Sequence, residues 1–76
     1  MNEGLVETVA AAIRRYLEIR PGAVDTLEGI HHFWIDWRSQ TESIAITAEA
    51  LKRLVEEGLL EQKKIGSRVL WRHVKN

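Results

Sequence analysis

The sequence predicts an α+β domain, mainly helical, in which three helices precede a C-terminal two-stranded β-hairpin. Three observations predict this fold class. Apolar residues recur at helical spacing in three separate stretches before Gly58. After Gly58 the spacing changes, and two extended runs of residues follow. Gly66 and Ser67 lie between these runs and are typical of a tight hairpin turn.

The length and composition predict one small globular domain, residues 1–76, with no linker and no internal repeat. Apolar residues make up 45% of the chain, and three of the residues are Trp. A domain of this size buries only about 60% of the surface that its unfolded chain exposes. We therefore expect a thin core, to which a partner chain could add buried surface.

Several classes of protein are disfavoured by what the sequence lacks. It has no cysteine, which removes disulfides, thiol nucleophiles and thiolate metal sites. No apolar run approaches the length of a membrane span, and the N-terminal residues lack the basic-then-apolar layout of a signal peptide. We expect a cytoplasmic protein that does not enter the membrane.

The first helix is expected at residues 2–19. Asn2 is the expected N-cap, because its side chain can accept hydrogen bonds from backbone N–H groups of the first turn. Pro21 disfavours helical geometry at the preceding residue and ends the helix. The apolar stripe consists of Leu5, Val9, Ala12, Ile13, Tyr16 and Leu17.

The second helix is expected at residues 26–35, with Asp25 as the N-cap and Glu28 reaching back to it in a capping box. Gly29 inside this helix indicates a close approach to another backbone, because glycine otherwise weakens a helix by about 1 kcal/mol. Before the helix, Ala23 and Val24 form a candidate short strand against the hairpin, an alternative that two residues leave open. The apolar face of the second helix consists of Leu27, Ile30, Trp34 and Trp37.

The third helix is expected at residues 40–57. Ser39 and Glu42 have the spacing of a capping box, and Thr47 is a competing N-cap that would start the helix later. The earlier start is favoured by a continuous apolar stripe of Ile44, Ala48, Leu51 and Val55. Gly58 is typical of the left-handed residue that follows a helix.

The hairpin is expected at residues 59–65 and 68–74, with Gly66 and Ser67 as a two-residue turn. Such a turn fixes the register, so that Lys64 lies opposite Val69, Gln62 opposite Trp71 and Leu60 opposite His73. We expect the face with Val69, Trp71 and His73 to cover the helices, and the face with Arg68, Leu70 and Arg72 to point away.

Charge is divided unevenly along this chain of zero formal net charge. Residues 1–60 hold six Lys and Arg against ten Asp and Glu, a net charge of −4. Residues 61–76 hold five Lys and Arg against one Glu, a net charge of +4. A basic end on an acidic body hints at a polyanion or at a partner of complementary charge.

Residues 50–71, ALKRLVEEGLLEQKKIGSRVLW, resemble the winged helix-turn-helix domains of bacterial transcription regulators. In that superfamily a third, recognition helix leads through a Gly-Leu-Leu exit into a basic, glycine-tipped hairpin called the wing. The positions that carry the resemblance are Ala50, Leu51, Leu54, Gly58, Leu59, Leu60, Gly66 and Trp71. The resemblance implies double-stranded DNA as the partner and a homodimer that reads two half-sites.

This resemblance implies DNA contacts from two parts of the chain. The third helix would contribute Gln40, Thr41, Ser43, Thr47, Lys52 and Arg53, and the wing would contribute Lys63, Lys64, Arg68 and Arg72. The alternative is a winged helix that binds protein, since the same helix also carries four glutamates: Glu42, Glu49, Glu56 and Glu57.

Aromatic residues crowd the end of the second helix. Phe33 and Trp37 are the candidates for a protein-partner surface, because large aromatic side chains are enriched where partners meet. Trp34 and Trp71 are more typical of residues that complete the core. The expected partner is a second copy of the chain or another protein.

No catalytic, metal or cofactor site is expected, and the chain is not expected to be an enzyme. His31 and His32 are adjacent, so on a helix they point about 100° apart and do not chelate one ion. The carboxylates and serines lack the spacing of an acid–base pair or a nucleophile elbow, and no glycine-rich phosphate loop is present.

Overall fold

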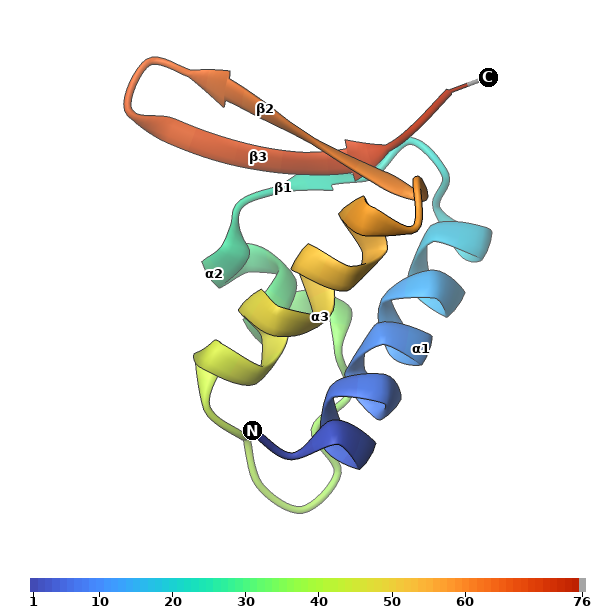
Figure 1. Cartoon of the computed structure of the whole chain (residues 1–76), viewed down its shortest axis with the longest axis vertical. Helices are drawn as coiled ribbons and strands as arrows, with labels where there is room; N and C mark the ends of the chain where they lie inside the picture. The colour runs from blue at the N-terminus through green and yellow to red at the C-terminus, as the bar shows by residue number, and fades with distance from the viewer. Residues whose placement is uncertain (76) are drawn as a thin grey trace.

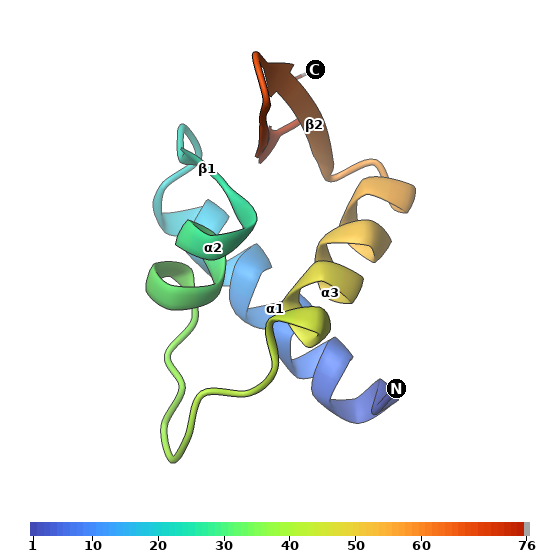
Figure 2. The same ribbon diagram turned by 90° about the vertical axis from the view of Figure 1, so that its left-hand side faces the viewer.

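The structure is a computed structural model that describes residues 1–75. It has an α+β architecture of three helices and a three-stranded antiparallel sheet, and about half of the chain is helical. The sheet lies across one end of the helices (Figures 1 and 2). The expected α+β class is confirmed, and the sheet contains, besides the two strands of the hairpin, the short strand that the sequence had left open.

The first helix, α1 (Glu3–Ile19), has the expected bounds to within one residue. The Leu5 backbone N–H donates to Asn2 Oδ1 at 2.9 Å, which confirms Asn2 as the N-cap. The inward face carries Val6 and Ala10 in addition to the expected Val9 and Ile13.

The short strand β1 (Val24–Asp25) follows α1 and pairs antiparallel with β3 (Arg68–His73). Val24 lies opposite Arg72 and Asp25 lies opposite Trp71. This confirms that the chain around Val24 pairs with the hairpin, and it places β1 at one edge of the sheet in the order β1-β3-β2.

The second helix differs from its expected form. It consists of α2 (Leu27–Gly29) and a wider π-helical segment, η1 (Ile30–Trp34). Thr26, not Asp25, is the N-cap, and its Oγ1 accepts from the Gly29 N–H at 3.2 Å. The expected role of Asp25 is wrong because Asp25 belongs to β1, and its Oδ1 accepts from the adjacent Thr26 N–H at 2.8 Å.

Position 29 must be glycine because a side chain lies against it. The sequence had instead predicted a close approach of another backbone segment. A Cβ at this position would lie 2.0 Å from Asp25 Oδ1, far inside the distance at which atoms repel. The carboxyl group of Asp25 therefore fills the space that a larger residue at position 29 would need.

The third helix, α3 (Ile44–Glu56), begins four residues later than expected. Ser43 is the N-cap, and its Oγ accepts from the Ala45 N–H at 3.2 Å. Both expected caps, Ser39 and Thr47, are therefore wrong. Residues 36–43 form a loop before α3, and Trp37 anchors the start of this loop to η1, because its Nε1–H donates to the His31 carbonyl at 2.7 Å.

The C-terminus of α3 has the expected glycine stop. Gly58 has a φ of +82°, in the left-handed region that favours glycine. The Leu59 N–H donates to the Leu54 carbonyl and the Gly58 N–H donates to the Val55 carbonyl, each at 3.0 Å. These two bonds are the pair that defines a Schellman motif, and they direct the chain from α3 into the sheet.

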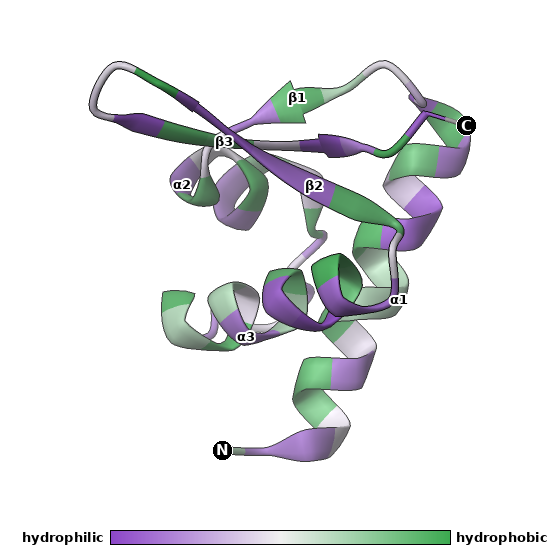
Figure 3. Ribbon diagram, turned by 45° about the horizontal axis from the view of Figure 1, so that its top comes forward, coloured by the Kyte–Doolittle hydropathy of each residue, from purple (hydrophilic) through white to green (hydrophobic). Residues whose placement is uncertain are grey.

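The hairpin of β2 (Leu60–Ile65) and β3 has the expected register. Ile65 lies opposite Arg68, so the turn contains only Gly66 and Ser67, and the three expected cross-strand pairs are confirmed. Leu60 is buried where β2 leaves α3, and the rest of the strand is mainly hydrophilic (Figure 3).

One core joins the three helices to the sheet. Trp34 is only 6% exposed, and its ring stacks on that of Tyr16 with centroids 4.5 Å apart. Trp71 packs against the same core from β3. The buried apolar residues are Val6, Val9, Ala10, Ile13, Leu17, Ile30, Trp34, Ile35, Ile46, Ala50, Leu51, Leu54 and Leu60.

A polar pair lies inside this core. His31 of η1 is 3% exposed and Thr47 of α3 is fully buried, and His31 Nδ1 lies 2.6 Å from Thr47 Oγ1. Burial lowers the pKa of His31 below its ordinary value of 6.5, and the neighbouring His32 lowers it further; a hydrogen bond to the Glu42 backbone acts in the opposite direction. The neutral ring therefore links η1 to α3.

We expect stability to fall on acidification below pH 6.5. The pKa of His31 is lower in the folded chain than in the unfolded chain, so on acidification the unfolded chain binds a proton at His31 first. The contribution of His31 to the free energy of unfolding is therefore constant above pH 6.5. It decreases as the pH falls from 6.5 to the lowered pKa. Urea unfolding at pH 7.5, 6.0 and 5.0 measures this. The variant His31→Gln should lose this pH dependence, whereas exposed His32→Gln should keep it. An unchanged midpoint for the natural chain from pH 7.5 to 5.0 would contradict the assignment.

Candidate nucleic-acid interface

The basic side chains of the hairpin are grouped near its turn. Lys63 and Lys64 are on β2, Arg68 is the first residue of β3, and all three are exposed. None of them forms an ion pair with another residue in the range 1–75. The register places Lys63 and Lys64 on opposite faces of the hairpin, so positive charge surrounds this end of it.

Arg72, expected beside these residues, is different. It lies on β3 opposite Glu61, and its Nε is 2.6 Å from Glu61 Oε2. This cross-strand ion pair neutralises Arg72 and leaves it less able to bind a phosphate than the cations near the turn.

Arg53 is also engaged within the molecule. Its guanidinium contacts Glu3 at 2.5 Å and Glu7 at 3.1 Å, both on α1, and lies 3.8 Å from Glu49 on its own helix. The hydrogen bond from Arg53 lowers the pKa of the Glu3 carboxyl. Arg53 thus links α3 to α1, and the expectation that it presents its charge to a groove of DNA does not fit this geometry.

The remaining candidates from the expected third helix do not form one surface. Thr47 is fully buried against His31 and has no access to a ligand. Gln40 and Thr41 lie in the loop before α3, and the Ser43 hydroxyl caps the helix. Of the six helix candidates, Lys52 alone lies exposed within α3 and forms no ion pair with another residue of the range 1–75.

The outward face of α3 has little of the chemistry that reads bases. Ala45, Lys52 and Glu56 are exposed, and Ala48 and Glu49 are half-buried between them. Bidentate readers of base edges are mainly Arg, Lys, Asn and Gln, of which this face offers one Lys. The two glutamates would repel phosphates.

The two aromatic candidates for a partner surface differ in their exposure. Phe33 is 78% exposed, as a partner-binding residue should be. Trp37 is half-buried, packs against the core and donates its indole hydrogen bond to His31. Trp37 therefore packs against the core, as its place on the expected apolar face indicated, and its indole hydrogen bond is the part that the sequence did not indicate.

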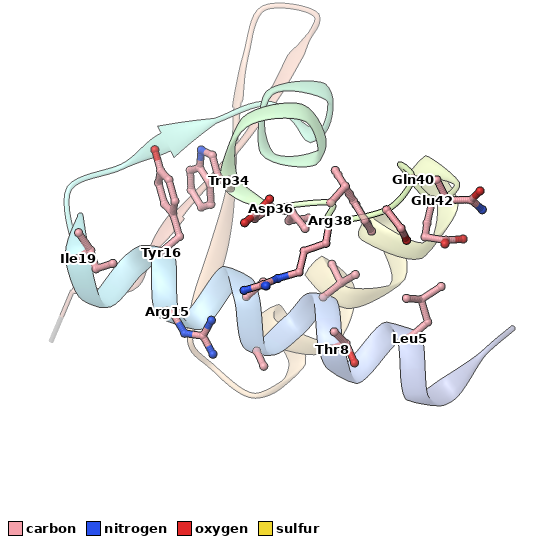
Figure 4. A pocket seen from close by; sticks show the side chains of 16 residues that line it. Leu5, Thr8, Arg15, Tyr16, Ile19, Trp34, Asp36, Arg38, Gln40 and Glu42 are labelled. Carbon is pink, nitrogen blue, oxygen red and sulfur yellow. The ribbon is translucent and has the colours of Figure 1, made fainter.

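The structure adds a groove that sequence reasoning missed. It has a volume of about 640 Å³ and lies between α1 and the segment from Trp34 to Glu42 (Figure 4). Arg15 of α1 and Arg38 of the loop line it. No pattern in the sequence links these two residues, because they line the same groove only once the 34–42 segment has folded beside α1.

Other kinds of site are not seen in the described chain. Among residues 1–75, no group of three or more His, Cys, Asp or Glu side chains is arranged to hold a metal ion. Within the same residues, no helix combines the length and apolar character needed to cross a membrane.

Comparisons of the chain with protein-family models, curated proteins and solved structures found no match.

Proposed function

We propose that the chain is a winged helix and that it binds double-stranded DNA, mainly through the phosphates. Its element order supports the fold: a helix, a short strand, two helices and a hairpin in one three-stranded sheet. In this proposal α3 is the recognition helix and the β2–β3 hairpin is the wing. The Schellman turn at Gly58, which leads directly from one to the other, also supports it.

One observation carries the functional proposal. Lys63, Lys64 and Arg68 are exposed and unpaired in the described chain, whereas Arg53 and Arg72 are held by carboxylates. When an unpaired cation on a projecting hairpin binds a DNA phosphate, counterions are released from the DNA. This release favours binding and does not depend on the base sequence. Exposed Lys52 on α3 extends this set toward the recognition helix.

The same geometry limits sequence specificity. With Ala45, Ala48 and Glu49 on the outward face of α3, few direct contacts to base edges are available. The proposal is therefore of weak, salt-sensitive binding in the range of non-specific complexes, with dissociation constants of roughly 1–100 μM.

We expect the triple variant Lys63→Ala, Lys64→Ala, Arg68→Ala to lose most of this binding. Fluorescence anisotropy with a labelled mixed-sequence duplex, titrated at several salt concentrations, measures it. Each phosphate contact contributes about −0.9 to the slope of log K against log salt, so removal of three contacts should flatten the slope by roughly 2.7. Circular dichroism checks that the variant is folded.

Matched control variants distinguish the effect of unpaired cations on DNA affinity from that of cations in ion pairs. Arg53→Gln and Arg72→Gln remove charges that are already neutralised within the molecule, so each should change DNA affinity by no more than about twofold. If the natural chain shows no salt-dependent binding at low salt and high micromolar protein, DNA binding is rejected.

A second candidate is a winged helix that binds only protein. The acidic and small side chains of α3 favour it, because Glu49 and Glu56 interrupt a positive face, and the 78% exposed Phe33 offers an apolar contact. Absence of DNA binding in the titration, together with self-association in sedimentation that Phe33→Ala abolishes, would support this candidate as a homodimer.

A further inference from the structure

We propose that the sheet binds an acidic amphipathic segment of a partner protein on the face that is turned away from the helices, here called the outer face. Leu60 of β2 and Trp71 of β3 pack into the core, and successive residues of a strand point to opposite sides of the sheet. The outer face therefore holds the odd-numbered residues of β2, the even-numbered residues of β3, and Val24, which lies opposite Arg72. The helices lie on the other side of the sheet (Figure 1).

An apolar stripe crosses the outer face diagonally and contains one aliphatic residue from each strand: Val24, Leu70 and Ile65. Leu70 is the diagonal neighbour of Ile65, because Ile65 lies opposite Arg68. Leu70 is also the diagonal neighbour of Val24, because Val24 lies opposite Arg72. Diagonal neighbours lie about 7–8 Å apart, so the stripe is about 15 Å long. Leu70 is half-buried, whereas Ile65 is 55% exposed and Val24 is 50% exposed, so both ends of the stripe leave apolar surface in water.

Positive side chains flank the stripe on both sides. Lys63 lies opposite Leu70 on one side of the stripe, and Arg68 lies opposite Ile65 on the other side. Both cations are exposed, and neither forms an ion pair with another residue in the range 1–75. The charges nearest to the stripe are thus positive and unpaired.

The outer face as a whole has a net charge of +2. Its charged residues in the three strands are Lys63, Arg68 and Arg72 against Glu61. The carboxylate of Glu61 is already engaged, because its Oε2 lies 2.6 Å from Arg72 Nε. An occupant with Asp or Glu on both sides of its apolar residues would pair Lys63 and Arg68 as it covers the stripe. Complementary charge of this kind selects one class of partner against others.

Other occupants match the outer face less well. The same face of a second copy would bring Lys63 and Arg68 of the two copies together, and such like-charge contacts are costly. DNA would pair these cations, but it is bound mainly through polar groups of its backbone and base edges, so the ends of the stripe would lack an apolar contact. Membrane interfaces favour Trp and Tyr, and the outer face holds neither.

The outer-face site goes beyond the proposed DNA binding and does not rest on it, since the binding of a protein segment is measured without DNA. The site shares Lys63 and Arg68 with the proposed DNA interface, whereas Lys64 points to the other face of the hairpin. A bound acidic segment should therefore compete with DNA for the hairpin.

A displayed library of random 16-residue peptides, selected on the full chain, tests this proposal. The stripe is as long as about ten residues of helix, so the expected consensus has apolar residues every three or four positions, with Asp or Glu between them. A synthetic peptide of that consensus is then labelled. Its affinity is measured by fluorescence anisotropy at about 150 mM salt, where charges more than about 8 Å away are largely screened.

Charge reversal on the outer face should weaken the binding of this peptide. The double variant Lys63→Glu, Arg68→Glu should lower the affinity at least about tenfold. Its control, Lys52→Glu, Lys64→Glu, reverses as many charges away from this face and should keep the affinity within about threefold. All four positions are exposed, and circular dichroism confirms the fold of each variant.

Replacement of the apolar ends tests the stripe itself. The double variant Val24→Thr, Ile65→Thr keeps branched side chains that suit strands and should lower the affinity at least about tenfold. Ile44→Thr is the control, because Ile44 is an exposed aliphatic residue at the start of α3, and this variant should change the affinity by no more than about twofold.

The proposal is overturned if no peptide is enriched, if the consensus lacks acidic residues, or if either outer-face variant binds the peptide as well as the natural chain does. Three further results would overturn it by identifying another occupant. In Val24→Thr, Ile65→Thr they are a loss of binding to vesicles of phosphatidylserine and phosphatidylcholine, a loss of affinity for duplex DNA, or a loss of a dimer seen by sedimentation velocity.

Discussion

Replacement of Trp34 by alanine should lower the free energy of unfolding by about 3–5 kcal/mol, the cost typical of removing a large buried aromatic side chain. Trp34 is 6% exposed, and its ring stacks on Tyr16 and so connects η1 to α1. Its removal leaves a cavity between these two elements. A chain of 76 residues has a total stability of roughly 4–11 kcal/mol. Thermal unfolding followed by circular dichroism should show a midpoint at least about 12 °C lower.

The adjacent residue is a matched control. Phe33 is also an aromatic residue of η1 but is 78% exposed, so Phe33→Ala should change stability by no more than about 0.5 kcal/mol. Equal effects of the two variants would mean that η1 is rotated with respect to the core.

Replacement of Thr47 by valine should cost about 1–3 kcal/mol, although valine has nearly the same shape. The substitution removes the hydroxyl that lies 2.6 Å from His31 Nδ1 and leaves a buried ring nitrogen without its partner. Urea unfolding at pH 7.5, where the lowered pKa keeps His31 neutral, measures the difference.

Thr8→Val is the control for this prediction. Thr8 is exposed on α1 and its hydroxyl donates to the Gly4 carbonyl at 2.9 Å, so water replaces the lost bond and stability should stay within about 0.5 kcal/mol. The double variant His31→Leu, Thr47→Val removes both polar partners and should recover part of the loss. A Thr47→Val chain as stable as the natural one would show that His31 does not need this bond.

The parts of the fold that were predictable depend on neighbours in sequence. The Asn2 cap, the Gly58 stop and the two-residue turn at Gly66 each arise from one or two side chains and the adjacent backbone. These local rules also gave the cross-strand register, because a two-residue turn leaves no freedom in the pairing of β2 and β3.

The errors occur where a distant contact overrides a local pattern. Asp25 and Ser39 each begin a capping-box sequence, but pairing with Trp71 places Asp25 in β1, and Ser39 lies at a bend in the loop that follows the anchored Trp37. The π-helical turn of η1 likewise has no local signature, since its residues also fit an ordinary helix.

The candidate site was predictable in part for the same reason. The basic hairpin follows from composition and register: Lys63, Lys64 and Arg68 were expected to contact DNA and are exposed, and their contact with DNA stays a prediction. Thr47 was misplaced, although it lies three residues before Ala50 and four before Leu51, two fully buried positions on the same side of α3. The ion pairs of Arg53 with α1 join residues about fifty positions apart, so no local sequence pattern predicts them.

The short length of β1 gives the two halves of the hairpin different mechanical properties. Only Arg72 and Trp71 of β3 pair with β1, so the half toward the turn is a two-stranded ribbon that extends beyond the helices (Figure 1). A two-stranded ribbon is less stable than a sheet of three strands, and this half, which borders α2 only at residues 67–69, should open at a lower free energy than the core. Lys63, Lys64 and Arg68 all belong to this half. In the proposed DNA complex, the positive charges therefore lie on the part of the sheet that needs the least free energy to change shape, so we expect this part to adapt to the DNA backbone while the helices stay in place.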